Sequence, residues 1–403
     1  MMEAFSSRRY KCLFTGAILA LLLTLILSAC NGAGSTTTAN STATKSAGIG
    51  NSSTTTTTGS APQLKLGTRP CPEAVKDPSY WDPIVGTQAN VSKVESVSCA
   101  NLEGSSSLQA LISVRYYGNG QVLDVYVYNN ITDPSPTQIF KLQNLYKGNA
   151  RISGYNTLLT AEVDQDSSVN KHVSSNATLT QDLFREFKWS DGAGTLIPVT
   201  FPGIFPDLTR YQAETAQAKV NQGQQPWRLS AIQTAQALAA NLLHWNPSSP
   251  ATILSGGGNS DLNAVVTVKS TNPGSATITV TLSRLEGNSK GNIWEATSVT
   301  SPDLSISIPR DRDLLTNPIT VKGTGNAFEG RVGKVIVLDH LYTDIGHAEA
   351  IGVAGNGSTT FSMSVTYKST FKSGLQEGVV VLYSYSSADG SISGAAMVKE
   401  MLS

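Results

Sequence analysis

The sequence predicts a mainly β protein with an α+β middle region and a C-terminal β-sandwich. Three observations predict this fold class. Short runs rich in β-branched and aromatic residues recur between turn residues, which is the pattern of antiparallel strands. One segment near the middle of the chain has helical spacing and a capping box. Only 14% of the residues are charged, and Ser, Thr, Asn and Gly are abundant, as expected of a secreted β protein with many polar turns.

The chain has 403 residues, which is enough for two or three folded domains of about 150 residues each. Composition shifts divide it into five parts. We expect an export signal at 1–29, a Ser/Thr-rich tether at 30–62, a β-rich domain with a disulfide at 63–205, an α+β domain at 206–302 and a β-sandwich at 303–403. The tether has too few apolar residues to form a core, so we expect it to be disordered.

The β-rich domain is expected to contain two hairpins. Residues 108–116 and 121–129 are rich in β-branched and aromatic residues on either side of a Gly-Asn-Gly turn. Residues 184–189 and 195–201 flank a Ser-Asp-Gly turn in the same way.

The α+β domain begins with two expected helices. Residues 206–221 form a polar helix that Gly223 ends. In the second and clearer helix, Ser230 and Gln233 form a capping box, and Pro247 stops the chain from continuing as a helix. Its apolar face is expected to carry Ile232, Ala235, Ala239 and Leu242.

Strands at 262–269, 276–285 and 293–299 follow, so the helices are expected to pack on a curved antiparallel sheet. If this region binds a small molecule or sugar, we expect Trp227, Trp245 and Trp294 to line the pocket. At the end of the second helix, however, Trp245 is also typical of a core. His244 is typical of a last turn, where it interacts favourably with the helix dipole.

In residues 303–403, short strands recur about every 8–12 residues with turn signals between them, which is the spacing of a β-sandwich. The residues expected to face inward are Ile319, Val321, Val335, Val337, Met363 and Val365.

The same region resembles the Gmad-type immunoglobulin-like domain of bacterial surface and spore-germination lipoproteins. The resemblance rests on the strand at 317–325, the turn Ala327-Phe328-Glu329-Gly330 and the late turn at 387–391, which occur in the family's order. It implies a C-terminal immunoglobulin-like β-sandwich and a link to germination. Phe328 and Glu329 are candidate contact residues, but we favour the interpretation that Phe328 fills the core and Glu329 shapes the turn.

The N-terminus has the three parts of a secretory signal. Arg8, Arg9 and Lys11 are followed by an apolar run at 13–26 and then by Leu27-Ser28-Ala29-Cys30. This box resembles that of bacterial lipoproteins, which implies cleavage before Cys30 and lipidation of that residue with acyl chains such as palmitate. The alternative is an uncleaved membrane helix, for which the run is slightly short of the ~20 residues needed.

Cysteine use is consistent with export. Cys12 lies in the signal and Cys30 in the box, which leaves Cys71 and Cys99. In an exported protein these two most simply form a disulfide. Two free thiols are an alternative, whereas a metal site is a poor one because no His or further Cys lies near either residue.

Nothing in the sequence supports catalysis or a cofactor. No Gly-x-Ser-x-Gly motif occurs, and His340 and His347 do not have the spacing of a helical zinc site, so we interpret their surroundings as a charged loop. The acidic stretches at 101–105 and 164–168 lack the glycine and distal glutamate of a calcium loop, and we interpret both as turns, with bound calcium as the alternative. We therefore expect a protein that is not an enzyme and has no metal.

The charge balance excludes a nucleic-acid binder. The chain has 29 basic and 29 acidic residues, and the expected signal contains three of the basic residues and one of the acidic ones. The part that follows therefore has a net charge of 26 − 28 = −2, whereas a nucleic-acid binder needs a basic surface. We expect a non-catalytic protein lipid-anchored on the extracytoplasmic face of a bacterial membrane. It would bind an envelope protein or polymer at the cell surface, in a setting linked by resemblance to sporulation and germination. The alternative is a ligand-binding lipoprotein that uses the middle region.

Overall fold

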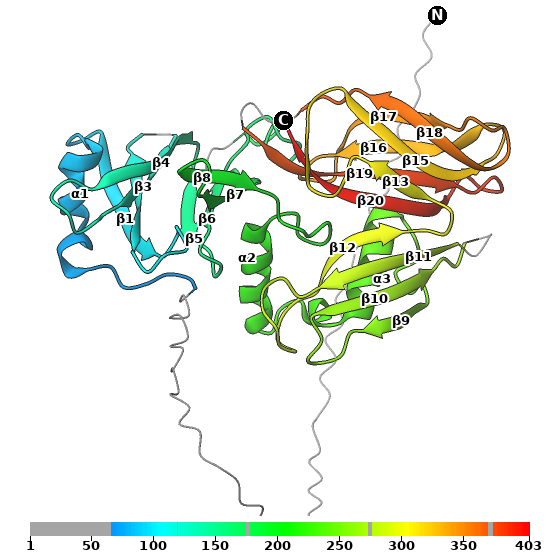
Figure 1. Ribbon diagram of the computed structural model, residues 1–403, viewed down its shortest axis with the longest axis horizontal. Helices are drawn as coiled ribbons and strands as arrows, with labels where there is room; N and C mark the ends of the chain where they lie inside the picture. Colours follow the sequence, from blue (N-terminus) through cyan, green and yellow to red (C-terminus); the bar gives the residue numbers. More distant parts are fainter. Residues whose placement is uncertain (1–65, 119, 175–177, 273–275, 370–373) are drawn as a thin grey trace, which may run out of the picture. The chain divides into compact units, whose positions relative to one another are not determined.

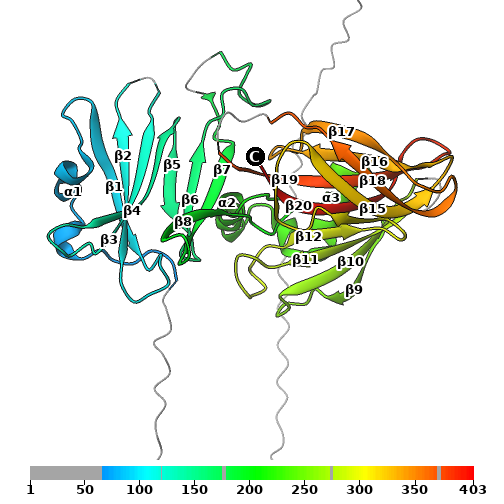
Figure 2. The same ribbon diagram turned by 45° about the horizontal axis from the view of Figure 1, so that its top comes forward.

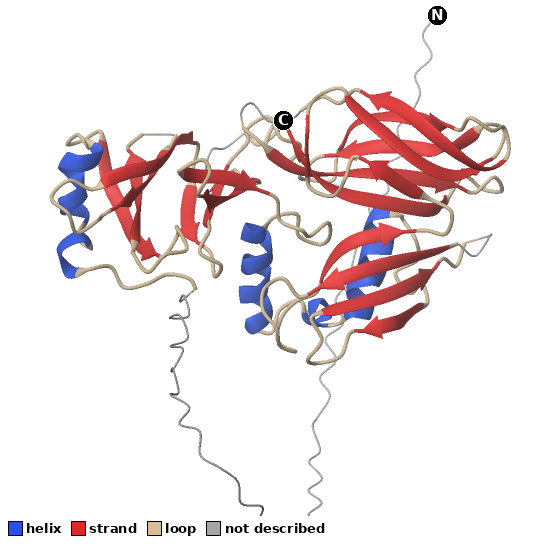
Figure 3. Ribbon diagram, viewed as in Figure 1, coloured by secondary structure: helices blue, strands red, loops and turns tan. Residues whose placement is uncertain are grey.

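The computed structural model describes residues 66–118, 120–174, 178–272, 276–369 and 374–403. Strands make up 45% of them and helices 12%, which confirms the mainly β fold class (Figure 3). The expected signal, the box ending at Cys30 and the tether lie outside the described residues. Within the described part, no helix is both long enough and apolar enough to span a bilayer.

Two four-stranded antiparallel sheets form the part of the structure from residue 66 to about residue 200. The first has the order β1-β2-β3-β4, with β1 Ser92–Ala100, β2 Gln109–Tyr116, β3 Leu123–Asn129 and β4 Thr137–Leu145. The second has the order β5-β6-β7-β8, with β5 Asn149–Ile152, β6 Leu158–Glu162, β7 Leu183–Ser190 and β8 Thr195–Val199. Figure 2 shows these two sheets side by side. Both predicted hairpins are confirmed, as β2–β3 and β7–β8.

The inner strands β2 and β3 of the first sheet are buried on both faces. Because successive side chains along a strand point to opposite sides, these strands contribute to two cores. On one face, Leu111 packs with Leu158 and Phe187 of the second sheet. On the other face, Ile112 packs with Trp81. Trp81 lies on the short helix α1 (Pro78–Val85), which follows the 3₁₀ turn η1 (Glu73–Val75).

The predicted disulfide is confirmed. Cys71 and Cys99 are bonded with an S–S distance of 2.07 Å. The bond joins the segment before α1 to the end of β1, where Arg69 also forms a bridge with Cys99 and donates to its carbonyl oxygen at 2.7 Å. The segment before α1 is therefore held to the first sheet by a covalent bond and a backbone hydrogen bond.

Both predicted helices of the middle region are present. α2 spans Arg210–Asn221 and begins with a full capping box between Thr209 and Gln212, four residues later than the sequence pattern predicted. After the turn η3 (Pro226–Leu229), α3 spans Ala231–Leu242, and the Ser230 side chain accepts from the Gln233 backbone as predicted.

The buried face of α3 differs from the predicted one by a rotation of about one residue. Ala235 and Ala239 are buried as predicted, but Leu238 and Thr234 accompany them, while Ile232 and Leu242 are only partly buried. The small residues let α3 approach the sheet closely, and Leu238 belongs to the same core as the sheet residues Val266 and Val280. Packing against this sheet decided which face of the helix is covered.

A long sheet continues from the middle region into the C-terminal region (Figure 1). Its order is β17-β16-β19-β20-β12-β11-β10-β9, and β14 pairs with β20. The strands are β9 Ala251–Gly256, β10 Asn263–Lys269, β11 Thr277–Ser283, β12 Glu295–Thr300, β14 Asp313–Leu315, β16 Arg331–Leu338, β17 Asp344–Ile351, β19 Gln376–Tyr385 and β20 Ile392–Leu402. The junction lies between β12 and β20, where Val299 pairs with Met397.

A three-stranded sheet covers one face of this long sheet and completes the sandwich. Its order is β13-β15-β18, with β13 Ser305–Ile308, β15 Ile319–Ala327 and β18 Gly357–Val365. The predicted inward-facing set is confirmed. Ile319, Val321, Val335, Val337 and Val365 are buried in the shared core, and Met363 packs against it partly buried.

The opposite face of β16, β19 and β20 is also buried, by α3 and the middle region. Alternate residues of these strands, such as Ile336, Val381 and Met397, belong to a core that also contains Leu238 and Trp294. The C-terminal sandwich and the middle region therefore share hydrogen-bonded strands and a core across residue 302, where the sequence suggests a boundary.

Candidate functional site

The two loops at one end of the C-terminal sandwich expose large apolar side chains. The first loop is the turn 328–330 between β15 and β16, taken with Arg331 at the start of β16. The second is the connection 352–356 between β17 and β18, taken with Ile351 at the end of β17. Phe328 is 64% exposed, Ile351 57% and Val353 85%. We call residues 328–331 and 351–356 the loop tip.

Hydrogen bonds tie the two loops together. The Gly330 amide donates to the Gly355 carbonyl oxygen at 2.5 Å, and the Gly352 amide donates to that of Gly330 at 2.8 Å. The Glu329 amide donates to the Asn356 side chain at 3.0 Å. Because the backbone is fixed at three points, the apolar side chains stand on a defined surface and cannot simply collapse onto the core.

The prediction that Phe328 fills the core is wrong, whereas the prediction that Glu329 shapes the turn is confirmed. Phe328 does not fill the core, because it pairs with Arg331 across a tight turn that directs its side chain outward. Glu329 has φ of 51° and Gly330 φ of 80°, so these two residues form the reversal. Glycine adopts a positive φ without steric cost, which explains the Gly in this motif.

The charges beside the loop tip nearly balance. Arg331 forms an exposed ion pair with Glu349 at 3.3 Å, and Glu329 is exposed on the turn. An exposed pair of this kind contributes little to stability, about 0–1 kcal/mol. The apolar side chains are therefore the main chemical feature of this end of the sandwich.

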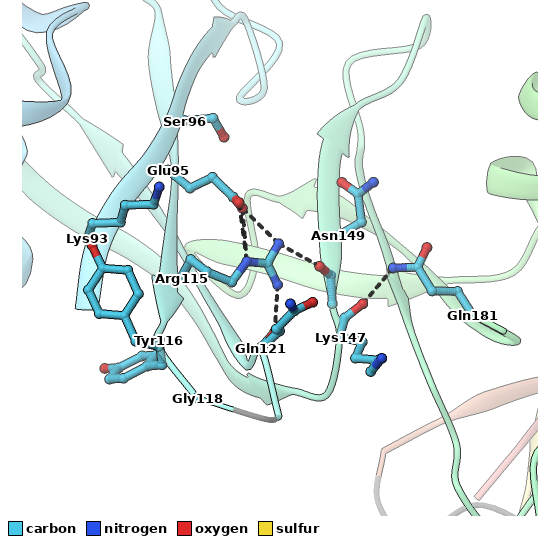
Figure 4. A pocket seen from close by; sticks show the side chains of 12 residues that line it. Lys93, Glu95, Ser96, Arg115, Tyr116, Gly118, Gln121, Lys147, Asn149 and Gln181 are labelled. Atoms are coloured by element: carbon cyan, nitrogen blue, oxygen red, sulfur yellow. Dashed lines mark hydrogen bonds and ion pairs between the residues drawn. The ribbon is translucent and has the colours of Figure 1, made fainter. Parts of the chain in front are cut away.

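A second candidate is a polar cavity of about 720 Å³ between the first two sheets (Figure 4). Arg115 lies at its centre and binds Glu95 at 2.7 Å. The same guanidinium donates to the carbonyl oxygens of Gln121 at 2.7 Å and Gly148 at 2.9 Å. Most of its N–H groups are thus used to hold two turns together, so the side chain has a structural role here.

The three tryptophans suggested as a ligand site do not meet at one cavity. Trp294 is fully buried, and the Arg284 guanidinium lies 4.2 Å from its ring centre. Trp245 is 2% exposed, and its indole N–H donates to the Ile392 carbonyl oxygen at 2.8 Å. Trp227 lines a cavity of about 320 Å³ beside α2, and neither Trp245 nor Trp294 is among the residues that line it. Trp245 and Trp294 are core residues because their rings fill the space between α3 and the sheet.

The histidines are also separate. His340 is buried with its Nε2 3.6 Å from Asp182, whereas His347 is exposed and its Nδ1 lies 2.7 Å from Asp344. Among the described residues there is no group of three His, Cys, Asp or Glu side chains that could hold a metal ion.

The sequence analysis did not predict the buried ion pairs of Arg228 and Lys399. Arg228, 2% exposed, contacts Asp207 at 2.8 Å and also Glu295. Lys399 lies 2.9 Å from Glu377 and donates to the Leu208 carbonyl oxygen at 2.5 Å. These contacts attach the segment before α2 to the long sheet.

Burial is the main cause of the pKa shifts in this network. It raises the pKa of Glu377 to about 7 although Lys399 acts to lower it, and burial lowers the pKa of Lys399. The only signal in the sequence is that charged residues interrupt otherwise apolar strands, as at 399–400, which does not by itself identify their partners.

The comparison with protein families agrees with this architecture in part of the chain. Residues 303–391 match the model of the Gmad2 family, described as the immunoglobulin-like domain of bacterial spore germination. The C-terminal sandwich is thus a Gmad-type immunoglobulin-like domain, as the sequence suggested. A comparison with curated proteins gives no match.

Proposed function

We propose that this protein is a non-catalytic, lipid-anchored protein of the bacterial cell surface, and that its loop tip binds an envelope protein or polymer. The Gmad2 match supports a setting in spore germination. The lipobox-like residues Leu27 to Cys30 and the Ser/Thr-rich tether support an anchor that keeps the folded part away from the membrane.

One observation carries the proposal: Phe328, Ile351 and Val353 are exposed on a backbone that hydrogen bonds hold in place. Single exposed apolar residues are ordinary, but a cluster of them marks an interaction site more often than chance. A fixed backbone also lowers the entropy lost on binding, because fewer conformations have to be given up. The tip therefore suits a partner with a complementary apolar surface.

Photo-crosslinking from position 353 in intact cells tests the binding surface. A photoreactive residue replaces Val353 in one variant and Leu254 in the matched control, since Leu254 is 61% exposed on the edge strand β9. We expect a discrete crosslinked species from position 353 only. Phe328→Ser should reduce its yield about fivefold through lost apolar contact. The same species from both positions, or an unchanged yield in the serine variant, would contradict the proposal.

Membrane fractionation tests the anchor separately. Cys30→Ala removes the thiol that would carry the lipid, so the protein should leave the membrane fraction or accumulate uncleaved. Cys71→Ala/Cys99→Ala is the matched control, because it removes the two disulfide-bonded cysteines and should leave the mass of the N-terminal modification unchanged. Unchanged membrane partition and unchanged mass in Cys30→Ala would refute lipidation.

A further inference from the structure

A cavity of about 500 Å³ lies where the end of α3 meets the outer face of the C-terminal sandwich. The cavity is lined by residues 241–244, at the end of α3 and just beyond it, and by residues of β16 and β19. The sheet side chains that line it, Ile336, Leu338 and Tyr383, are only 9%, 7% and 5% exposed, so they form the floor of the cavity. This volume is within the range of about 300–1,000 Å³ that small-molecule sites occupy.

The wall is apolar and fixed in position. Leu242, Ile336 and the Tyr383 ring line it, and the Tyr383 hydroxyl donates to the Leu242 carbonyl oxygen at 3.0 Å. A second ring, that of Tyr342, lies beside them, and its hydroxyl donates to the Ile204 carbonyl oxygen at 2.9 Å. Because both hydroxyls are bonded to the backbone, the two rings are held as parts of a preformed wall.

The rim carries neutral hydrogen-bonding groups. Asn241 is exposed, and its side-chain amide donates to the Ala237 carbonyl oxygen at 2.8 Å. His244, which lies just beyond the end of α3, and Tyr385, 42% exposed at the end of β19, also line the cavity. An amide, an imidazole and a phenol can each donate and accept hydrogen bonds.

Charge excludes an anionic ligand here. None of the described residues that line the cavity is Lys or Arg, and the single carboxylate, Asp344, lies 2.7 Å from the His347 ring. Farther along the same sheet face, Lys334 is in register with Glu349, whose carboxylate forms the ion pair with Arg331. The cavity in Figure 4 differs, because Lys93, Arg115 and Lys147 line it together with one carboxylate, that of Glu95.

From this combination we infer that the cavity binds one or two rings of a neutral saccharide. A pyranose ring has an apolar face of C–H groups, which fits against a tyrosine and aliphatic wall, and hydroxyls at its edge, which fit the amide, imidazole and phenol of the rim. The site is distinct from the loop tip, so it stands or falls independently of the proposed surface interaction.

Saturation-transfer NMR on the intact folded chain tests this site, with three uncharged probes: tetra-N-acetylchitotetraose, cellotetraose and maltotetraose. We expect transfer to the ring protons of at least one of them. Tyr385→Ala removes a rim ring outside the core and should weaken that binding about fivefold. Asn241→Trp adds bulk at an exposed position over the cavity and should abolish it. Tyr117→Ala, at an aromatic residue that is 54% exposed beside the other cavity, is the matched control and should change nothing.

No transfer to any of the three probes at millimolar concentration would exclude a neutral saccharide site. Binding that both Tyr385→Ala and Asn241→Trp leave intact would place the ligand elsewhere. Binding of trigalacturonate in preference to the uncharged probes would show that the charge argument is wrong. Circular dichroism of each variant separates lost binding from lost folding.

Discussion

Glu400 should make the protein less stable as the pH rises. It lies on the central strand β20, is fully buried, and neither of its carboxylate oxygens has a hydrogen-bond partner among the described residues. Its register partner on β14 is Asp313, another acid. Burial, and then the negative charges of Asp313 and Asp311, raise the pKa of Glu400 from its usual 4.5 to about 9.

The magnitude follows from proton linkage. An acid with a raised folded-state pKa binds its proton more tightly when folded, so between pH 4.5 and 9 the unfolded chain has fewer protons bound than the folded one. The free energy of unfolding then falls by about 1.4 kcal/mol per pH unit from this one group. Between pH 5 and pH 8 the loss is about 4 kcal/mol.

Glu400→Gln isolates this effect, because the amide has nearly the same shape and does not ionise. Urea unfolding followed by tryptophan fluorescence at pH 5, 6.5 and 8 measures the free energy of unfolding, with the buried Trp245 and Trp294 as reporters. The variant should gain about 4 kcal/mol relative to the wild type between pH 5 and pH 8. Glu329→Gln, on the exposed turn, is the matched control and should follow the wild type. Parallel pH profiles for Glu400→Gln and the wild type would refute the reasoning.

Two further predictions concern stability. Cys71→Ser/Cys99→Ser opens a loop of 28 residues and should lower the free energy of unfolding by about 3–4 kcal/mol, measured by urea unfolding. Ser105→Ala, which leaves the disulfide intact, is the control. A loss in the double variant no larger than the loss in Ser105→Ala would contradict the prediction. Arg228→Met leaves the carboxylates of Asp207 and Glu295 without their cation and should lower the free energy of unfolding by about 3–5 kcal/mol. Arg228→Met/Glu295→Leu should recover much of this loss. Equal losses in both variants would show that the buried charge is not the cause.

Local signals in the sequence predicted much of the fold. The β2–β3 and β7–β8 hairpins follow from strand residues around short turns, and α3 follows from its cap at Ser230. The alternating strands of the C-terminal sandwich indicated which side chains face its core, from Ile319 to Val365. In each case the information lies within about a dozen neighbouring residues.

Features that depend on distant parts of the chain were not predictable in this way. The pairing of β12 with β20 joins residues about a hundred positions apart, and no local pattern encodes it. Trp245 and Trp294 are of a residue type that often lines binding sites, but here they are core residues packed with α3 and the sheet. Phe328 is of a residue type usually found in cores, but the turn on which it lies directs its side chain outward.

The position of β20 has a consequence for how the protein is made. The family match ends at residue 391, and β20 begins at the next residue. Yet β20 is an interior strand, paired with β19 on one side and with β12 on the other. During synthesis, neither neighbour can complete its pairing until the chain has emerged as far as residue 402. A premature stop at the start of β20 would therefore remove this interior strand and leave two newly exposed edges, which are prone to aggregation.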